Sequence, residues 1–266
     1  MSDLLYLYSL IPTNESNTPL PSLQGFDDKS ELYMVSIGDD VTAIVCDVAT
    51  SEETIKEKID QDVEWLQEKA FHHHERVLQL SKLYTLIPLK FCTLYKSEAS
   101  LRDTVESNYE KLKETFSLIE GKEEWNVKIY CDDEALRKQV SENNTAIQAK
   151  REEIEELSPG KKFFERKKMD HYIDQELENE KTSFCEGIHD ALNAYSVLGN
   201  IKKNWKKDVT GRKENMAWNS VFLLPQHEVE AFITKFKEYE EKFTDSGWQF
   251  EASGPWPAYH FSSFTS

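Results

Sequence analysis

The stretch GPWPAYHF, residues 254–261, stands near the end of the chain and determines how the rest of it is interpreted. Its two prolines exclude a helix and disfavour a central strand, because each proline fixes φ and lacks a backbone N–H donor. Its aromatic side chains nevertheless indicate burial, whereas an untethered terminus is usually mobile. We therefore expect an extended strap that docks on this chain or on a partner. The simpler alternative is a strap that only covers one edge of the preceding domain.

The residues before this strap predict a ferredoxin-like domain over 122–253. Apolar patterning and turn signals give the order strand, helices, strand, strand, helix, strand, which is a split βαβ arrangement with an enlarged first crossover. The crossover, about 132–198, is expected to be a helical hairpin that sets an acidic run against a basic run. Two strands, 201–209 and 216–224, are expected to form a β-hairpin after it.

The first part of the chain predicts a separate α+β domain. An apolar run, 4–11, indicates a buried strand, and two strand-like runs around Gly38 indicate a tight hairpin. Two amphipathic helices follow, one from about 52 to 80 and one over 97–119. The length also suggests roughly two domains. The predicted organisation is therefore two α+β domains and a tail, with the bounds 1–121, 122–253 and 254–266.

Charge limits the partners that this chain could have. Acidic residues outnumber basic ones by 49 to 32, and the formal net charge at pH 7 is −17. Such a surface repels phosphate backbones and anionic lipids, so neither nucleic acid nor a membrane is an expected partner. No run approaches the roughly 20 apolar residues of a membrane-spanning helix. Asp3 stands where a signal peptide carries basic residues, so we expect a cytoplasmic protein.

The cysteines and the glycines give no sign of an active site. No cysteine pair has C-x-x-C spacing, which excludes a zinc knuckle and a thioredoxin-type motif, and scattered thiols are usually small buried hydrophobes. The sequence also lacks a G-x-S-x-G elbow, a phosphate-binding loop and a dinucleotide fingerprint. We therefore predict no catalytic residue, no cofactor and no small-molecule substrate. The four cysteines are Cys46, Cys92, Cys131 and Cys185.

A run of three histidines followed by Glu75, residues 72–75, is the strongest candidate for a metal site. Neighbouring residues on a helix point about 100° apart, so the run cannot converge on one ion. Only Glu68, His72 and Glu75 share a helix face that could hold a metal. Charged residues on an outer helix face are the norm, and we favour a structural or solvent-facing role for this cluster.

A basic stretch, KKNWKK at 202–207 with Arg212 and Lys213 after it, contrasts with the acidic whole. Cations interleaved with an aromatic side chain also occur in nucleic-acid-binding strands, although the net charge argues against that role here. Lysines on a strand can instead blunt an exposed sheet edge, which is the interpretation that we favour. Contact with an acidic protein partner is an alternative.

Short motifs occur along the whole chain in an order that is specific, although each one is weak alone. They are YLY at 6–8, EWL at 64–66, HERVL at 74–78, PLKFCT at 88–93, EEWNVK at 123–128 and the strap at 254–261. Together they resemble the GvpF/GvpL family of gas vesicle proteins over essentially all 266 residues. The family pattern has glycine where this chain has Cys92, arginine at Lys90 and proline at Ala258. Cysteine in place of glycine predicts that position 92 does not need positive φ.

The resemblance implies a non-enzymatic role in building the gas vesicle, a protein-shelled, gas-filled compartment that provides buoyancy. Members of the family engage the small hydrophobic shell subunit and other accessory gas vesicle proteins during assembly. They are also similar in having two α+β domains with the C-terminal tail folded back on the N-terminal domain. That arrangement agrees with the strap expected from residues 254–261.

Two other functions remain open on the sequence alone. One is a generic acidic adaptor in the cytoplasm, and the other is a metal-dependent enzyme that uses Glu68, His72 and Glu75. For the favoured role, docking of the tail or binding of a partner is expected at the aromatic and proline residues of the strap and at the sheet edge near residue 90. The candidates are Pro255, Trp256, Pro257, Tyr259, Phe261, Pro88 and Phe91.

Overall fold

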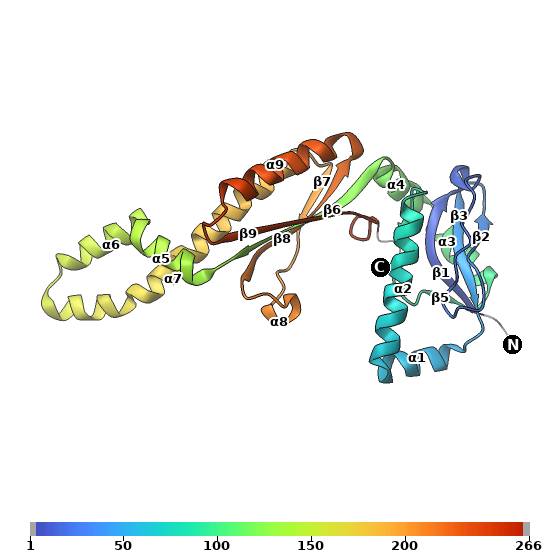
Figure 1. Ribbon diagram of the computed structural model, residues 1–266, viewed down its shortest axis with the longest axis horizontal. Coiled ribbons are helices and arrows are strands. Elements are labelled where there is room, and N and C mark those ends of the chain that lie inside the picture. The colour runs from blue at the N-terminus through green and yellow to red at the C-terminus, as the bar shows by residue number, and fades with distance from the viewer. Residues whose placement is uncertain (1–3, 263–266) are drawn as a thin grey trace. The chain divides into compact units, whose positions relative to one another are not determined.

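A computed structural model describes residues 4–262 and divides the chain into two compact units (Figure 1). Unit 1 comprises Met1–Glu124 and Pro255–Ser266, and unit 2 comprises Trp125–Gly254. Each unit combines one β-sheet with helices, so the predicted α+β class is confirmed. No helix in the described part of the chain is long and apolar enough to cross a membrane.

The sheet of unit 1 is built around its first strand. β1 is buried along nearly all of its length and pairs antiparallel with β3, β4 and β5, giving the order β2-β3-β1-β4. The expected hairpin is present, because Ile37 pairs with Val41 across a turn in which Gly38 has φ +62°. The strands are β1 (Leu4–Pro12), β2 (Tyr33–Ile37), β3 (Val41–Val48), β4 (Ile87–Pro88) and β5 (Leu94–Tyr95).

Helices cover both faces of this sheet. Successive side chains of a strand point to opposite faces, and β1 accordingly sends Leu5 and Leu7 into one apolar cluster and Tyr6 and Tyr8 into another. The first cluster includes residues of α3 (Glu98–Ser107) and α4 (Tyr109–Ile119). The second includes residues of α1 (Glu52–Gln61) and α2 (Val63–Ser81). A strand buried on both faces explains the continuous apolar run at the start of the sequence.

Both helices predicted for unit 1 are interrupted, so the expectation of two continuous helices was wrong. Asp62 separates α1 from α2 with φ −124° and ψ 89°, and its side chain accepts a hydrogen bond from the backbone N–H of Trp65. The residue acts as an N-cap, a role that aspartate favours over the helix interior. Asn108 likewise separates α3 from α4. The apolar period continues across both breaks, which is why the pattern did not reveal them.

Unit 2 contains a four-stranded sheet in the order β7-β8-β6-β9. β7 pairs antiparallel with β8, with Leu198 opposite Leu223. The expected strand 201–209 was wrong: β7 ends at Ile201, and residues 207–210 form the short helix α8 (Lys207–Thr210). The strands are β6 (Lys122–Cys131), β7 (Leu198–Ile201), β8 (Asn215–Pro225) and β9 (Trp248–Trp256).

A helical hairpin joins β6 to β7, as the sequence predicted. Asp132 caps its first helix by accepting hydrogen bonds from the N–H groups of Glu134 and Ala135. The expected charge pairing is present at one point, where Glu155 lies 2.8 Å from Lys162 and 2.6 Å from Arg166. The helices are α5 (Asp133–Asn143), α6 (Thr145–Glu155) and α7 (Pro159–Asn193), and α9 (Val229–Lys242) follows η2 (Gln226–Glu228) before β9.

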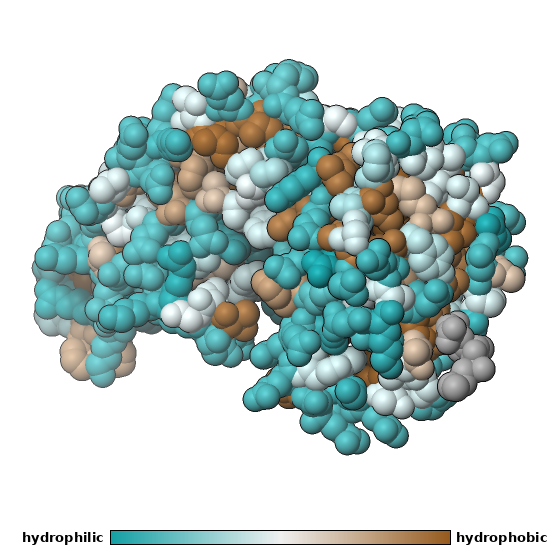
Figure 2. All heavy atoms as spheres, turned by 45° about the vertical axis from the view of Figure 1, so that its right-hand side comes forward, coloured by the Kyte–Doolittle hydropathy of each residue, from teal (hydrophilic) through white to brown (hydrophobic). Residues whose placement is uncertain are grey.

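The core of unit 2 lies between its sheet and the helices α7 and α9. Phe222 of β8 and Phe232 of α9 are fully buried there, together with Cys185 of α7. Burial raises the pKa of the Cys185 thiol to about 12, so it is a neutral packing group at physiological pH. Hydrophilic side chains cover most of the surface visible in Figure 2, with smaller apolar patches between them.

Candidate functional site

The tail of unit 1 begins where β9 ends. Pro255 lies exposed in β9, whereas Pro257 directly after the strand is buried. β9 is an edge strand of its sheet, and an edge strand tolerates proline because some of its N–H groups have no partner strand. The chain then makes a turn over 259–261. This geometry explains how β9 continues through Pro255, which the sequence analysis had assigned to the tail.

His74 of α2 is the aromatic contact point of this tail. Its Nδ1 lies 3.2 Å from the hydroxyl oxygen of Tyr259. The centroid of its ring lies 5.6 Å from that of Trp256 and 6.0 Å from that of Tyr259. Aromatic contacts of this kind contribute about 0.5 to 1.5 kcal/mol when they are buried. Since Tyr259 remains 39% exposed, we assign its contact to the lower end of that range.

Glu124 provides a second attachment, through the backbone of the tail. Its side chain is only 4% exposed in total, and Oε2 accepts a hydrogen bond from the N–H of His260 at 2.8 Å. Hydrogen bonds to a carboxylate are roughly twice as strong as neutral ones. Nearby, the hydroxyl of Ser262 donates to the carbonyl of Ala258 and closes the turn, and Phe261 is 9% exposed. Glu124 could not be selected from the sequence, because one acid among many carries no signal of burial.

The two candidates from the sheet edge lie elsewhere in unit 1. Pro88 is buried in β4, where it pairs with Ser9 of β1. Phe91 is half-buried, with its ring 6.2 Å from Phe26 and 6.1 Å from His73. The structure therefore brings Trp256 and Tyr259 to His74 of α2 and gives Pro88 and Phe91 internal contacts of their own.

A buried chain of hydrogen bonds fixes the segment that carries these two candidates. His73 lies 2.8 Å through Nδ1 from the hydroxyl of Tyr6 and 3.1 Å through Nε2 from the carbonyl of Leu89. The carbonyl can only accept, so Nε2–H donates to Leu89 and Nδ1 accepts from Tyr6. The Tyr6 oxygen in turn accepts from the N–H of Cys92 at 3.1 Å. Strand β1, helix α2 and the 89–92 segment are thus joined by neutral groups.

This arrangement requires an uncharged His73. Burial lowers the pKa of His73 to about 4 and raises the pKa of Tyr6 above its ordinary value. The His73 ring also stacks on Tyr8, with centroids 5.4 Å apart and planes 13° apart. A histidine that is 4% exposed and bonded at both nitrogens has no free lone pair for a metal or a substrate proton.

Cys92 adopts the left-handed conformation that glycine favours, with φ +60°. The expectation that position 92 does not need positive φ was therefore wrong. The conformation orients the backbone N–H of Cys92 toward the Tyr6 hydroxyl, so the turn is kept at a cost of roughly 1 to 2 kcal/mol for a residue with a Cβ. Burial raises the pKa of its thiol to about 11, which leaves it protonated and weakly nucleophilic.

The proposed metal ligands Glu68, His72 and Glu75 do not form a site. Among residues 4–262 no group of three or more histidine, cysteine, aspartate or glutamate side chains is placed to hold a metal ion. Glu68 and Glu75 are exposed, and Glu68 lies 3.4 Å from Lys69. Burial lowers the pKa of His72. The geometry gives the alternative of a metal-dependent enzyme no support.

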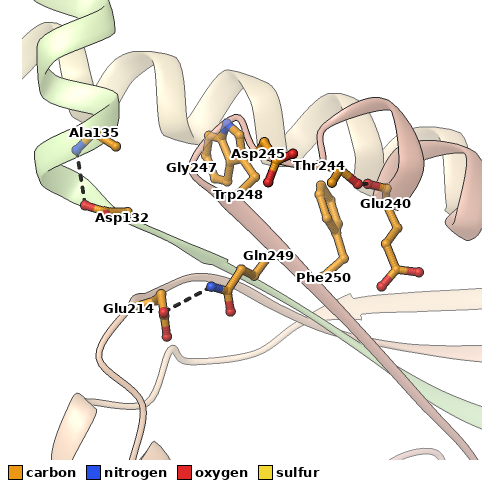
Figure 3. Close-up of a pocket in the computed structure, with 10 residues that line it drawn as sticks. All are labelled: Asp132, Ala135, Glu214, Glu240, Thr244, Asp245, Gly247, Trp248, Gln249 and Phe250. Carbon is orange, nitrogen blue, oxygen red and sulfur yellow. Dashed lines mark hydrogen bonds between the residues drawn. The ribbon is translucent and has the colours of Figure 1, made fainter.

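A hollow of about 630 Å³ lies between α5, α9 and β9 in unit 2 (Figure 3). Two of its four acidic residues hold the fold: Asp132 caps α5, and Glu214 accepts a hydrogen bond from Gln249 at 3.0 Å. The residues that line it include no histidine, cysteine or lysine. The lining therefore consists of carboxylates, aromatic rings and small polar groups.

Comparison with known proteins identifies the chain. The solved structure of the gas vesicle protein GvpF from Anabaena sp. PCC7120 has the same fold, with a TM-score of 0.77, 21% identity and full coverage of both chains. The GvpF structure from Microcystis aeruginosa matches with a TM-score of 0.70 and 19% identity, over 99% of this chain and 100% of that one. The fold is thus that of a GvpF-type gas vesicle protein.

The sequence comparisons agree with the fold. Gas vesicle protein L of Streptomyces sp. (strain CB03234) is 20% identical over 202 residues, covering 76% of this chain and 71% of that protein. Gas vesicle protein F1 of Halobacterium salinarum is 29% identical over 151 residues, covering 54% and 64%. The family model described as gas vesicle synthesis protein GvpL/GvpF matches residues 4–263. The chain therefore belongs to the GvpL/GvpF family, as its ordered motifs predicted.

Proposed function

We propose that this protein acts without catalysis as an accessory or minor structural protein in gas vesicle assembly. It binds the hydrophobic shell subunit and other accessory gas vesicle proteins in the cytoplasm where vesicles form. The observation that carries this proposal is the family match over 4–263. The bonding of the buried His73 at both ring nitrogens is consistent with a structural role for this histidine.

The physical basis of the proposal is protection of an aggregation-prone partner. A shell subunit that polymerises through apolar surface and strand edges must be held before it is incorporated. An acidic protein can do this because its charge, −17 here, keeps the complex in solution while exposed strand edges pair with the partner.

Within this role we interpret the chain as three functional parts. Residues 1–121 form the N-terminal domain, 122–253 a ferredoxin-like domain with the helical hairpin, and 254–266 a tail that locks onto the N-terminal domain. The strand order β7-β8-β6-β9 supports the ferredoxin-like interpretation, since the four strands occupy that order in a split βαβ fold. The hydrogen bonds of the tail with His74 and Glu124 support the lock.

The burial of the tail residues suggests how they share two roles. Pro257 and Phe261 are buried and Trp256 is half-buried, so we assign them to docking of the tail. Pro255 and Tyr259 are exposed and remain candidates for contact with a partner. Pro88 and Phe91 have internal contacts, and we assign them to support of the turn at Cys92 rather than to a partner.

Deletion of the gene from its native vesicle-forming cluster tests the proposal directly. Vesicles are scored by pressure-sensitive light scattering and electron microscopy. We expect vesicles to be lost, to return with the intact gene, and to stay absent with a gene truncated after Ala252. Normal vesicles without the gene, in a host that carries no second family member, would contradict the assembly role.

Purified components test the binding step separately. The protein, mixed with the shell subunit, should delay the appearance of light-scattering aggregates in proportion to its concentration. If the protein neither binds the shell subunit nor delays its aggregation, direct protection of the shell subunit is excluded. The variant truncated after Ala252 serves as the comparison for the tail; it also lacks the last residues of β9.

A further inference from the structure

The two edges of the sheet in unit 2 differ in how they are protected. Edge strand β9 contains Pro255 and Glu251, and the Glu251 carboxylate lies 2.9 Å from Lys128 and 2.8 Å from Arg212. Prolines and charges on an edge strand are devices that prevent pairing with another chain. Edge strand β7 (Leu198–Ile201) has neither, because its sequence is LGNI. Its backbone edge is therefore open to a further strand.

Apolar side chains along β7 are exposed to solvent. Leu198 is 41% exposed and Ile201 is 57% exposed, and Val197 directly before the strand is 47% exposed. Trp205 follows at 45% exposure. A single exposed apolar residue needs no explanation, but several in sequence along a free strand edge mark an interaction site.

The backbone of the same strand offers hydrogen-bonding groups toward solvent. Lys202 donates its N–H to the carbonyl of Asn219 at 2.7 Å, which fixes its backbone toward β8. Antiparallel pairs alternate between bonded and non-bonded positions, so Ile201 and Gly199 direct their N–H and C=O groups away from β8. These two residues are the positions at which an added strand would bond.

Lys203, Lys206 and Lys207 follow β7, which ends at Ile201, and leave the strand itself uncharged. Residues 202–204 continue along β8, because the side chain of Asn219 donates to the Lys203 carbonyl and that of Asn204 donates to the Ala217 carbonyl, both at 2.9 Å. Lys203, Lys206 and Lys207 are exposed, and within the described residues none of them makes an ion pair. They form an unneutralised cationic group at the end of an apolar edge.

We propose that the edge of β7 binds an extended segment of a partner protein, which adds a fifth strand to the sheet. The segment places apolar side chains beside Leu198 and Ile201 and acidic side chains beside Lys203, Lys206 and Lys207. Main-chain hydrogen bonds at Gly199 and Ile201 supply affinity, and the lysines supply specificity. This surface is argued from unit 2 alone and does not depend on the role proposed above.

Two other occupants fit the surface less well. A second copy of this chain pairing antiparallel through β7 would set the lysines beside the uncharged Tyr195 and Ser196, which supply no counter-charge. A nucleic acid would meet Asp208 and Glu214 in the same segment of a chain with net charge −17, and it could not use the strand edge.

Defined peptides test the proposal on the full-length protein. The probes are peptides of about nine residues, a typical strand length or slightly more, in which a run of valines is joined to a run of glutamates at one end or the other. Matched peptides carry lysine in place of glutamate. We expect the acidic peptides to bind with a dissociation constant on the order of tens of micromolar, and to slow amide hydrogen exchange at Gly199 and Ile201 by about fivefold or more.

Variants locate the binding on the edge and on the lysines. Ile201→Lys, which places a charge on the strand, should weaken binding by about tenfold, whereas Val63→Lys, a similarly exposed change in α2 of unit 1, should leave it within about twofold. The triple change Lys203→Glu, Lys206→Glu and Lys207→Glu should also weaken binding about tenfold. The matched control reverses three exposed lysines elsewhere, namely Lys82, Lys161 and Lys237.

Four results would overturn the proposal. These are no binding of any acidic peptide at about 1 mM, equal affinity for the lysine peptides, tighter binding of single-stranded oligonucleotides than of peptides, and a dimer that Ile201→Lys dissolves. The third result would assign the surface to nucleic acid, and the fourth would assign it to a second copy of the chain.

Discussion

His73 and His74 are neighbours on α2, yet their surroundings differ. His73 is 4% exposed and bonded at both ring nitrogens to Tyr6 and Leu89, inside the core of unit 1. His74 is half-buried and meets the rings of Trp256 and Tyr259 at the tail. One step of about 100° along the helix separates a group that holds the core together from one that receives a peripheral segment. Residue type therefore says little about role until the opposing element is known.

The largest difference between the two histidines should appear in stability. His73→Ala leaves the Tyr6 hydroxyl and the Leu89 carbonyl without partners and opens a cavity, so we expect a loss of about 4 kcal/mol in the free energy of unfolding of unit 1. His74→Ala should cost about 1 kcal/mol or less. Urea unfolding of both variants, followed by circular dichroism, gives the comparison. Equal losses would contradict the assignment of His73 to the core.

The stability that His73 contributes should depend on pH. The pKa of folded His73 is lowered to about 4, whereas an unfolded histidine titrates near 6.5. Between these values the unfolded state binds the extra proton, so stability is complete above about pH 6.5 and falls as the pH drops toward 4, by about 3 kcal/mol from this residue.

The matched variant for this titration is His73→Gln, whose amide can still donate to Leu89 and accept from Tyr6 without titrating. It should be less stable than the wild type at pH 7 and lose less stability on going to pH 4.5. A direct measurement is the NMR chemical shift of the His73 ring, which should stay that of a neutral imidazole at pH 5.5. A protonated His73 at that pH would be incompatible with the hydrogen-bond chain.

A smaller effect on stability is expected at Phe261, a buried residue of the tail. Phe261→Ala should lower the stability of unit 1 by about 2 kcal/mol, less than a central core site, because the residue lies near the end of the chain. Limited proteolysis reports the same loss as faster cleavage near residue 257. The control is Tyr259→Ala, which removes a more exposed ring. Equal cleavage rates in all three proteins would mean that Phe261 does not hold the tail.

The smallest effect sharpens the comparison at His74 itself. Tyr259→Phe removes only the hydroxyl that lies 3.2 Å from His74 Nδ1, and at this exposure we expect a loss of about 0.5 kcal/mol. A double-mutant cycle with His74→Ala should recover most of that value as coupling energy. Zero coupling would show that the contact between hydroxyl and imidazole does not contribute to docking.

Sequence reasoning succeeded where a local pattern has a local cause. The apolar run of β1 and the turn at Gly38 are both present, because strand burial and positive φ depend on neighbouring residues. The break at Asp62 escaped notice because the apolar period continues through it. The prediction of a strand over 201–209 was wrong, because alternation of apolar and polar residues in a lysine-rich segment does not distinguish a strand from a loop that is hydrogen-bonded through side chains.

The site was less accessible to prediction than the fold. The aromatic content of 254–261 drew attention to the tail, but His74 and Glu124 gave no signal, since they act through residues far along the chain. The left-handed turn at Cys92 was hidden because cysteine stands where glycine would reveal positive φ. Contacts between distant segments depend on how the chain folds, and the local patterns of a single sequence do not predict them.

Unit 1 consists of two segments that are separated in the sequence by unit 2, and this affects the order in which the units can fold during synthesis. Its first segment ends at Glu124 and its second begins at Pro255, so the ribosome must produce all of unit 2 between them. Translation of that intervening stretch takes on the order of 10 s, during which unit 2 has time to fold as a domain. Unit 1 meanwhile lacks Trp256 and Phe261, so it is completed only after unit 2 has been synthesised.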